Sequence, residues 1–557
     1  MKLKIIITLI LFMALSSKIY AIEDNNAEDH HYPPVPGYIN GQKMKLEKIA
    51  LKEDVKSDDE QDQEKIVIEE NIQKIFVEKI VVEGNQLLTD DEITPITEKY
   101  LNKELTIEEI NYIASEITEL YKSYGIRTAL AYLPPQEIME NTVNIKIIEG
   151  KIGKITVKGN KFTWGFHLKN AIKQKEGDIV FVPEIEQDIL KFNKNNDIKL
   201  KATIRKGEEL GETDIVLNVE ETQPFHLNFS ADNSGTYSTG RYKAGTTVTL
   251  DSLLGFRDRL TAHYGRSRSV DSVFASYDFP IGYGGTRIGA SFGYGGSAVT
   301  RGALRDYDVE SKIADYALYV TRPLYNGNKY KLFTTGSLNF KENTIFMLGE
   351  RLDKLGGDPP THIRTGTISF TGIANDKYGR WVHNSDFILG MDMFGGREQF
   401  FKYVGGLQRI NLIGKSCVLI LKASTQLSDD NLPAIEQIGM GGFSTVRGYP
   451  TSYAMGDYGY NFNTEFRFPI IPDKFSRLGK FSLKDKLQGV GFADLGSTFY
   501  GNNNMGRDTT LMGLGGGLRV KLSKYLMGRV DYGVGILNKG NDLPFAKLHF
   551  AIESAPF

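Results

Sequence analysis

The segment YGYNFNTEFRF, residues 458–468, indicates how the C-terminal part of this chain folds. Because side chains alternate between the two faces of a β-strand, its aromatic residues share one face, and Asn461, Asn463, Glu465 and Arg467 share the other. In a soluble sheet the aromatic face would pack against a core and the polar face would meet water. In a membrane-spanning barrel the aromatic face would meet lipid, and the polar face would line a water-filled lumen.

The same alternation recurs throughout the C-terminal region. Arg519 and Lys521 alternate with apolar residues, and so do Arg529 and Asp531. So many charges on the inner face of apolar strands favour a polar lumen over the packed core of a sandwich. About sixteen such segments occupy the last 334 residues (557 − 224 + 1), which leaves about 21 residues for each crossing and its connection. We therefore predict an all-β transmembrane barrel of about 16 antiparallel strands over residues 223–557.

Connections between these segments alternate in length. Short ones fall at residues 325–328 and 522–524, and long ones fall at 298–311, 346–362 and 438–456. Short turns on one side and long loops on the other are typical of barrels in the bacterial outer membrane. A helical membrane protein is excluded, because no run of 18 apolar residues follows the first 21 residues.

A repeated unit precedes the barrel. Residues 79–85 (KIVVEGN) and 154–160 (KITVKGN) align with an offset of 75. Capping-box spacings at 89–92 and 106–109 predict two helices in the first copy, and the order of elements is β-α-α-β-β. We therefore predict two tandem small α+β domains, at 74–150 and 151–222. Their sheet edges could accept an extended guest chain by strand addition; the alternative is that both domains are spacers.

The N-terminal 73 residues are predicted to be a signal peptide followed by a polar tether. Residues 1–21 have the charged start, apolar stretch and small final residue, Ala21, of a secretory signal peptide. Residues 22–73 are polar and charged, and predict a tether without a core. The net charge of −2 gives no general attraction to nucleic acid. The single cysteine, Cys417, lies in an apolar strand and is interpreted as a packing residue.

The long connection 438–456 contains GGFSTVRGYP, residues 441–450, with one cation between aliphatic and aromatic neighbours. On its own this is an ordinary surface turn. Within a barrel, Arg447 would be the inward-folded tip of an extracellular loop, and a buried guanidinium prefers a carboxylate in fork geometry. Asp494 is the best candidate, because it shares the inward face of a later strand with Phe492 and Gly496, and glycine leaves room for a loop. We interpret the pair as a latch that sets the position of the loop.

These segments resemble a known family. Val446, Arg447, Gly448 and Tyr449 resemble the loop-six signature of the TpsB transporters of two-partner secretion, the filamentous-haemagglutinin and haemolysin secretion/activation proteins. These belong to the superfamily of the outer-membrane barrel-assembly factor. Residues 492–496 resemble the family's Phe-x-Asp-x-Gly strand signature. Further likenesses, to its polypeptide-transport-associated (POTRA) domain and to the start of its barrel, occur at 133–136, 148–150, and 232–235 with Gly240.

The resemblance covers residues 74–557 and implies a monomeric sixteen-stranded pore in outer-membrane lipid, with two POTRA domains in the periplasm. It implies export, with or without activation, of one large partner protein, whose N-terminal secretion domain the POTRA domains bind. It implies no catalytic residue, metal, cofactor or nucleic acid. Two features depart from the pattern: residues 22–73 show no plug helix, and Phe557 is out of phase with the last strand.

Two other functions stay open on the sequence. An outer-membrane protein-assembly insertase of the same superfamily would use the barrel to fold other barrels, although such proteins usually carry more POTRA domains. A barrel enzyme such as a lipase would need a Ser–His pair near the lipid boundary, and the sequence offers no clear one.

Overall fold

The computed structural model describes residues 74–209, 211–414, 416–471, 477–478, 481–482, 486–501, 508–523, 525–537 and 545–554. They fall into two compact units, one ending at Gly150 and one beginning at Lys151, and each is described by itself. The expected signal peptide at 1–21, the tether at 22–73 and the phase of Phe557 lie outside the described residues.

The first unit is a small α+β domain. Its elements are β1 (Ile75–Val77), β2 (Lys79–Glu83), α2 (Asp90–Thr97), the 3₁₀ helix η2 (Glu98–Tyr100), β3 (Lys103–Leu105), α3 (Ile107–Ser123), β4 (Leu130–Tyr132) and β5 (Thr142–Ile148). The main sheet has the order β2-β5-β4, with β2 parallel and β4 antiparallel to β5. The predicted β-α-α-β-β order is therefore present, and the short pairing of β1 with β3, three residues on each strand, is an addition that the periodicity did not indicate.

Helix α3 forms where its sequence places a cap and an apolar stripe. Thr106 accepts a bond from the backbone N–H of Glu109 (3.2 Å), and Glu109 accepts one from the backbone N–H of Thr106 (2.7 Å). Such a reciprocal cap satisfies two backbone donors that the first turn leaves unpaired. The buried face of the helix packs on the sheet through Ile110, Ile113 and Ile117.

A buried glutamate, Glu149, closes the turn after β2 in the first small domain. The carboxylate of Glu149 accepts the backbone N–H groups of Gln86 and Leu87 and the hydroxyl of Tyr121, all at 2.8 Å. Burial, and then the hydrogen bond to Glu149, raises the pKa of Tyr121, so its hydroxyl stays a donor. In the second small domain the carboxylate of Glu221 likewise accepts backbone N–H groups of a turn.

The second unit begins with the other small domain. It contains β6 (Lys151–Lys158), α4 (Gly165–Lys169), α5 (Val182–Asn195), β7 (Lys199–Lys206) and β8 (Glu212–Glu220), with sheet order β6-β8-β7. The carboxylate of Glu221 accepts three consecutive backbone N–H groups, at 161–163, over 2.7 to 3.0 Å. The domain packs on the first short turns of the barrel. The indole of Trp164 donates to the main-chain oxygen of Leu254 (2.6 Å), and the buried Arg257 forms an ion pair with Asp197.

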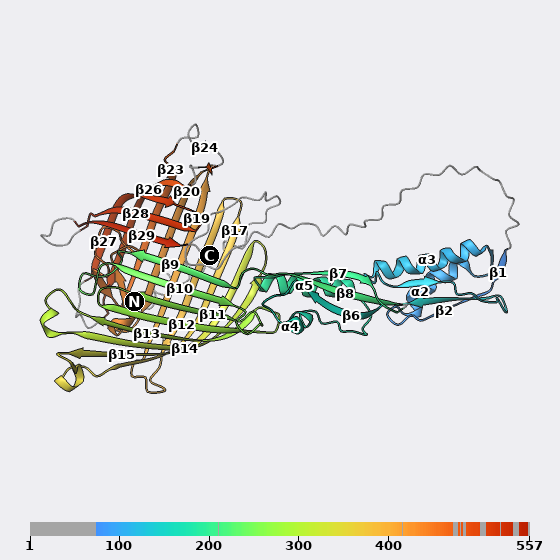
Figure 1. The fold of residues 1–557 in the computed structure, drawn as a ribbon, viewed down its shortest axis with the longest axis horizontal. Helices are drawn as coiled ribbons and strands as arrows, with labels where there is room; N and C mark the ends of the chain where they lie inside the picture. Colours follow the sequence, from blue (N-terminus) through green and yellow to red (C-terminus); the bar gives the residue numbers. More distant parts are fainter. Residues whose placement is uncertain are drawn as a thin grey trace. The chain divides into compact units, whose positions relative to one another are not determined.

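The barrel closes through sixteen antiparallel strands (Figure 1). They are β9 (Phe225–Asp232), β10 (Lys243–Asp251), β11 (Arg259–Arg266), β12 (Val270–Ile281), β13 (Thr286–Ala298), β14 (Glu310–Asn326), β15 (Tyr330–Met347), β17 (Thr361–Asp376), β18 (Gly379–Gly390), β19 (Phe400–Ile413), β20 (Cys417–Ser428), β23 (Tyr458–Pro469), β26 (Leu487–Phe499), β27 (Thr509–Lys521), β28 (Leu526–Gly535) and β29 (Ala546–Ser554). The short β16 (Glu350–Arg351) folds back on β15, and β24 (Arg477–Leu478) pairs with β25 (Phe481–Ser482). The predicted fold class and strand number are confirmed.

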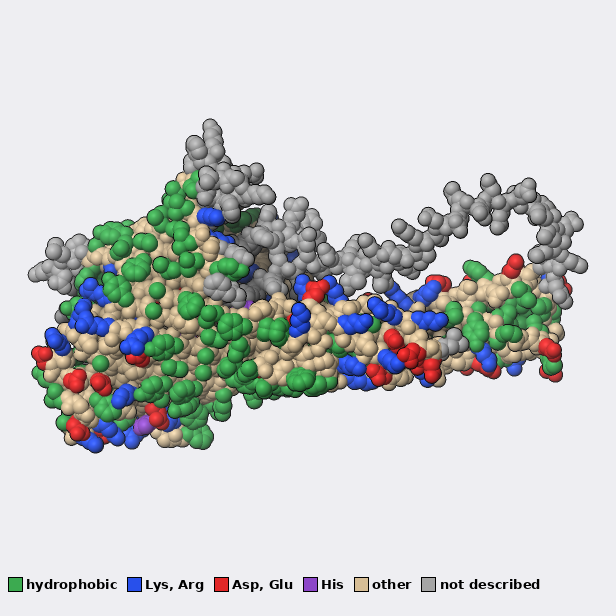
Figure 2. All heavy atoms as spheres, in the orientation of Figure 1, with side chains coloured by type: hydrophobic (Ala, Val, Ile, Leu, Met, Phe, Trp, Pro, Cys, Tyr) green, Lys and Arg blue, Asp and Glu red, His purple; other side chains and the backbone are tan. Residues whose placement is uncertain are grey.

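The side chains of β23 take the two faces that the alternation predicted. Phe462 and Phe466 are exposed on the outside, whereas Asn461 is 3% and Glu465 9% exposed on the inside. Figure 2 shows hydrophobic side chains gathered over the outer surface of the barrel strands. The outside of the barrel therefore suits lipid, and the inside holds the polar groups. Among the helices of the described residues, none has the length and apolar character needed to cross a membrane.

We predict that Glu149→Ala destabilises the first small domain by about 3 kcal/mol, because it leaves the hydroxyl of Tyr121 and two backbone donors without an acceptor. Hydrogen–deuterium exchange of the amides in α3 and β5 of the full chain measures the loss. The exposed Glu83→Ala is the control, with a change within about 0.5 kcal/mol. Equal exchange in the two variants would show that Glu149 does not hold the domain together.

Candidate functional site: a loop held inside the barrel

The loop between β20 and β23, the eleventh and twelfth strands of the barrel, carries the candidate site. It contains the 3₁₀ helix η5 (Ala434–Glu436) and a small sheet of β21 (Ile438–Met440) and β22 (Ala454–Gly456). Val446 and Tyr449 are fully buried, and Arg447 is 4% exposed. The tip of this loop is therefore packed inside the protein, and an exposed surface turn is excluded.

The structure brings Arg447 and Asp494 together in a fork. Nε of Arg447 lies 2.7 Å from Oδ2 of Asp494, and Nη2 lies 2.9 Å from Oδ1. The backbone N–H of Arg447 donates to the same carboxylate (3.1 Å). The guanidinium carbon also lies 3.6 Å from the centre of the Phe492 ring. Planar pairing with two parallel bonds is the strong geometry for this pair of ions, and the ring face adds a cation–π contact.

A wider charge network surrounds the fork. Nη1 of Arg447 contacts Glu465 (2.8 Å) on β23 and Asp531 (3.5 Å) on β28. Arg519 on β27 joins these two carboxylates, at 2.9 Å from Glu465 and 2.5 Å from Asp531. Three carboxylates and four guanidiniums take part, and the members are Glu465, Asp494, Asp531, Arg447, Arg467, Arg519 and Arg529. The alternation along the strands predicted that the charged residues around the Arg447–Asp494 pair point into the barrel. It did not assign them to the site.

Glycines on the barrel wall let the loop backbone come close. A side-chain carbon at Gly513 would fall 2.0 Å from the main-chain oxygen of Arg447, and one at Gly496 would fall 2.9 Å from a methyl of Val446. At Gly448 the backbone has φ +98°, and a side chain there would meet the backbone of β28. At Gly513 and Gly448 the loop and the wall are therefore in direct backbone contact, which only glycine allows at these two positions, whereas Gly496 leaves room for the side chain of Val446.

Tyr449 fixes the other side of the tip. Its hydroxyl donates to the main-chain oxygens of Met512 (3.1 Å) and Leu537 (2.7 Å). Its ring belongs to a buried apolar cluster with Met440 and Val446. The four residues Val446, Arg447, Gly448 and Tyr449 thus make four different kinds of contact with the wall: apolar packing, an ion pair, close backbone approach and a hydrogen-bonded hydroxyl.

The base of the loop has a second anchor, which sequence reasoning missed. Glu436, 7% exposed, forms ion pairs with Lys402 on β19 and with Lys341 on β15 (2.5 Å). Gln426 donates to the main-chain oxygens of both Glu436 and Asp457 (3.0 Å each). The base is therefore held by β15 and β19, and the tip by β23, β26 and β28. Glu436 lies in a segment without strand periodicity, so no pattern could have assigned its direction.

This arrangement can hold and release a loop. Taking charges out of water costs several kcal/mol per ion, and the network returns this only while every partner is in place. Removing one member leaves an uncompensated charge in the lumen. In the part of the chain that the structure describes, no group of three or more metal-ligating side chains occurs.

We predict that Arg447→Ala and Asp494→Ala each destabilise the folded barrel by about 3–5 kcal/mol, and that the double variant loses less than the sum. Denaturant unfolding of the protein in detergent measures the coupling. The matched control is the partly exposed bidentate pair Arg351–Asp353 (2.7 and 3.0 Å), whose cycle should give at most about 1 kcal/mol. Additive losses for Arg447 and Asp494 would contradict a latch.

Comparisons with known proteins identify the family of this chain. Residues 75–150 match the family model "POTRA domain, ShlB-type", and residues 211–520 match "Haemolysin secretion/activation protein ShlB/FhaC/HecB". The heme/hemopexin transporter protein HuxB of Haemophilus influenzae is 25% identical over 413 residues, or 70% of this chain and 71% of that protein. The outer membrane transporter CdiB of Dickeya dadantii is 24% identical over 404 residues, or 69% and 70%. The hemolysin transporter protein HpmB of Proteus mirabilis is 22% identical over 428 residues, or 72% and 73%.

Solved structures agree in fold. CdiB from Escherichia coli has a TM-score of 0.58 at 20% identity, and covers 89% of this chain and 93% of that one. BamA from Haemophilus ducreyi lacking POTRA domains 1–3 has a TM-score of 0.55 at 15% identity, and covers 87% and 100%. The model of the secretion protein spans 310 of the 557 residues (520 − 211 + 1). The chain therefore belongs to the haemolysin secretion/activation protein family ShlB/FhaC/HecB, the outer-membrane barrels of two-partner secretion whose POTRA domains lie in the periplasm.

Proposed function

We propose that this pore exports one large partner protein in an extended state, and that the loop carrying Arg447 leaves its place in the lumen while the partner passes. The burial of Arg447 in a charge network inside the barrel is the observation that carries the proposal. The latch must open for passage and must re-form to keep the pore closed. Arg447 then has a conformational role, and no bond-breaking role is assigned to any residue.

A single copy of this chain is enough to form the pore. All sixteen strands that close the barrel come from this polypeptide, and β29 meets β9 through residues 551–553 and 230–232. We therefore infer a monomeric pore surrounded by outer-membrane lipid. The names of the relatives refer to different transported partners, namely heme/hemopexin in HuxB and hemolysin in HpmB.

Capture of the partner is assigned to the small domains. Each three-stranded sheet has two edge strands, β2 and β4 in the first domain and β6 and β7 in the second. An edge strand offers unpaired backbone groups to an extended guest, so affinity comes with little demand on the guest's sequence. On β4 the side chain of Leu130 is 54% exposed, which gives an incoming strand an apolar contact beside the backbone bonds.

An insertase that folds other barrels is the second candidate. The likeness to BamA rests on 15% identity and supports the shared fold only. The family match and the relatives are transporters, so secretion is favoured. The insertase would act on many barrel substrates, whereas the secretion pore would act on one partner.

We predict that Arg447→Ala leaves the barrel inserted in the membrane and reduces export at least about tenfold, because the charge network loses its central cation. The amount of cognate partner outside cells is the measurement, and heat-modifiable migration in gels checks insertion. Arg351→Ala, which breaks a partly exposed pair outside the network, should export normally. Export at the wild-type level by Arg447→Ala would remove this arginine from the transport mechanism.

We predict that deleting residues 74–148 abolishes binding of the partner's secretion domain, because it removes β2 and β4 together with their sheet. Binding of the purified secretion domain to the purified pore measures capture. A deletion variant that binds as tightly as the full chain would make the first small domain a spacer.

A further inference from the structure

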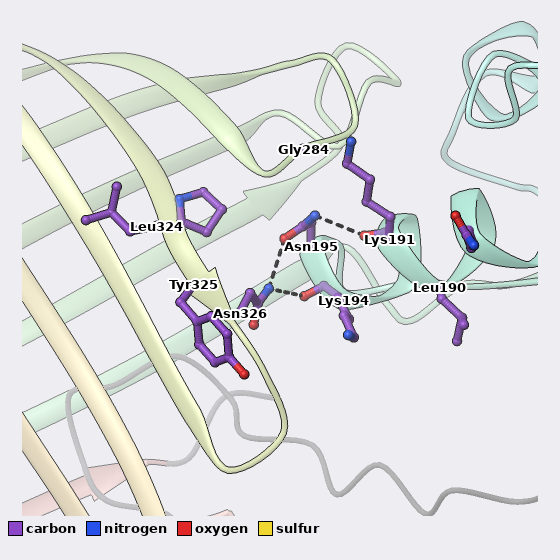
Figure 3. A pocket seen from close by; sticks show the side chains of 10 residues that line it. Leu190, Lys191, Lys194, Asn195, Gly284, Leu324, Tyr325 and Asn326 are labelled. Carbon is purple, nitrogen blue, oxygen red and sulfur yellow. Dashed lines mark hydrogen bonds between the residues drawn. The ribbon is translucent and has the colours of Figure 1, made fainter. Parts of the chain in front are cut away.

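A groove of about 380 Å³ lies where the second small domain meets the barrel (Figure 3). Helix α5 forms one wall, and the end of β14 with its short turn forms the other. The residues that give the groove its chemistry are Leu190, Lys191, Lys194, Leu324, Tyr325 and Asn326. None of these residues takes part in the loop contacts that hold Arg447.

Hydrogen bonds between the walls build the groove. The side-chain amide of Asn326 donates to the main-chain oxygen of Lys194 (3.1 Å) and to Oδ1 of Asn195 (2.9 Å). Asn195 in turn donates to the main-chain oxygens of Lys191 (2.9 Å) and Tyr283 (3.3 Å). Because these bonds use the backbone of the two lysines, their ammonium groups remain available. The shape of the groove is therefore set before any ligand arrives.

The groove lies at the level of the periplasmic headgroups. Outward side chains of β14 form a lipid-facing stripe, in which Leu318 is 59% and Val320 44% exposed. After Val320 the same face carries the exposed Arg322, and the strand ends with Leu324 and Tyr325, which are 53% and 57% exposed beside a short turn. Tyr325 stacks on Tyr330, with ring centres 5.9 Å apart. Aromatic pairs at the ends of the apolar band mark the interface between the hydrocarbon and the headgroups.

The facing side of α5 combines cations with an exposed apolar residue. Gln187, Leu190, Lys191 and Lys194 follow helical spacing, so they share one face. Leu190 is 53% exposed directly before Lys191, and in the described residues neither Lys191 nor Lys194 forms an ion pair. A lone exposed leucine next to unneutralised cations is the composition of a helix face that meets a membrane surface.

We propose that this groove binds the headgroup of an anionic phospholipid of the periplasmic leaflet. Lys191, whose side chain extends towards Gly284, and Lys194, on the other side of the bonded asparagines, supply the positive charge that attracts the phosphate (Figure 3). The acyl chains lie along Leu324 and the lipid-facing stripe of β14. Each lysine near an anionic surface adds attraction, so two of them give selectivity over zwitterionic lipid. The site ties the second small domain to the membrane and does not depend on the proposed role of Arg447.

Native mass spectrometry of the full chain, released from detergent with added phosphatidylglycerol or phosphatidylcholine, tests the site. We expect Lys191→Glu with Lys194→Glu to weaken phosphatidylglycerol binding about tenfold or more, and phosphatidylcholine binding to stay unchanged. Lys191→Arg with Lys194→Arg should keep binding, because the cations remain. The matched control is Arg205→Glu with Lys206→Glu, which also reverses two positive charges. These residues lie at the far end of β7, about 23 Å from Lys199, the end of the strand that follows α5.

Equal phosphatidylglycerol binding by the two charge-reversed variants would overturn the site, and so would equal affinity of the wild-type chain for both lipids. Inorganic phosphate is the third arm. Displacement of the lipid by phosphate at equal concentration would show a site for free phosphate and would contradict a lipid site. Normal heat-modifiable migration of all variants shows that the barrel is folded, so a loss of lipid binding reports on the groove.

Discussion

The structure depends on one constraint: a guanidinium inside a barrel must keep its carboxylate partners. Arg447 sits at the end of a long loop, yet it is 4% exposed and forms a fork with Asp494 on the wall. An uncompensated charge in this place would cost several kcal/mol, so the loop has one strongly preferred position. The same pair is weak as a source of net stability, because desolvation offsets most of its attraction. A contact of this kind specifies a position and can be exchanged for water when the loop moves.

The rest of the lumen is arranged around that contact. Gly496 and Gly513 remove side chains where the loop presses on the wall, and Tyr449 fixes the tip through two main-chain oxygens. Glu436 holds the base of the loop to a different part of the barrel, through Lys341 and Lys402. The base and the tip of the loop therefore have separate anchors. The proposed gating uses this separation: the tip leaves the wall while the base stays attached.

The sequence allowed part of this to be predicted. Alternation along the strands was sufficient for the fold class, the strand number and the inward direction of Asp494, because side-chain direction in a strand depends only on parity. Alternation does not tell how far along the barrel axis a residue lies. Glu465 and Asp531 were therefore recognisable as inward residues but not as neighbours of Arg447. Glu436 has no periodic context. The repeat at an offset of 75 found matching strands, while Glu149 and Glu221, 72 residues apart (221 − 149), do the same work without aligning.

The central claim is that the tip of the loop leaves the wall during export. A carbon at Gly496 would lie 2.9 Å from a methyl of Val446, which places cysteines at these two positions within reach of a disulfide. With Cys417 replaced by serine, the double variant Val446→Cys and Gly496→Cys contains a single thiol pair. Export of the partner should stop when this pair is oxidised and resume when it is reduced. Export at an equal rate with the disulfide formed would contradict the account, because the partner would then pass a loop that cannot move.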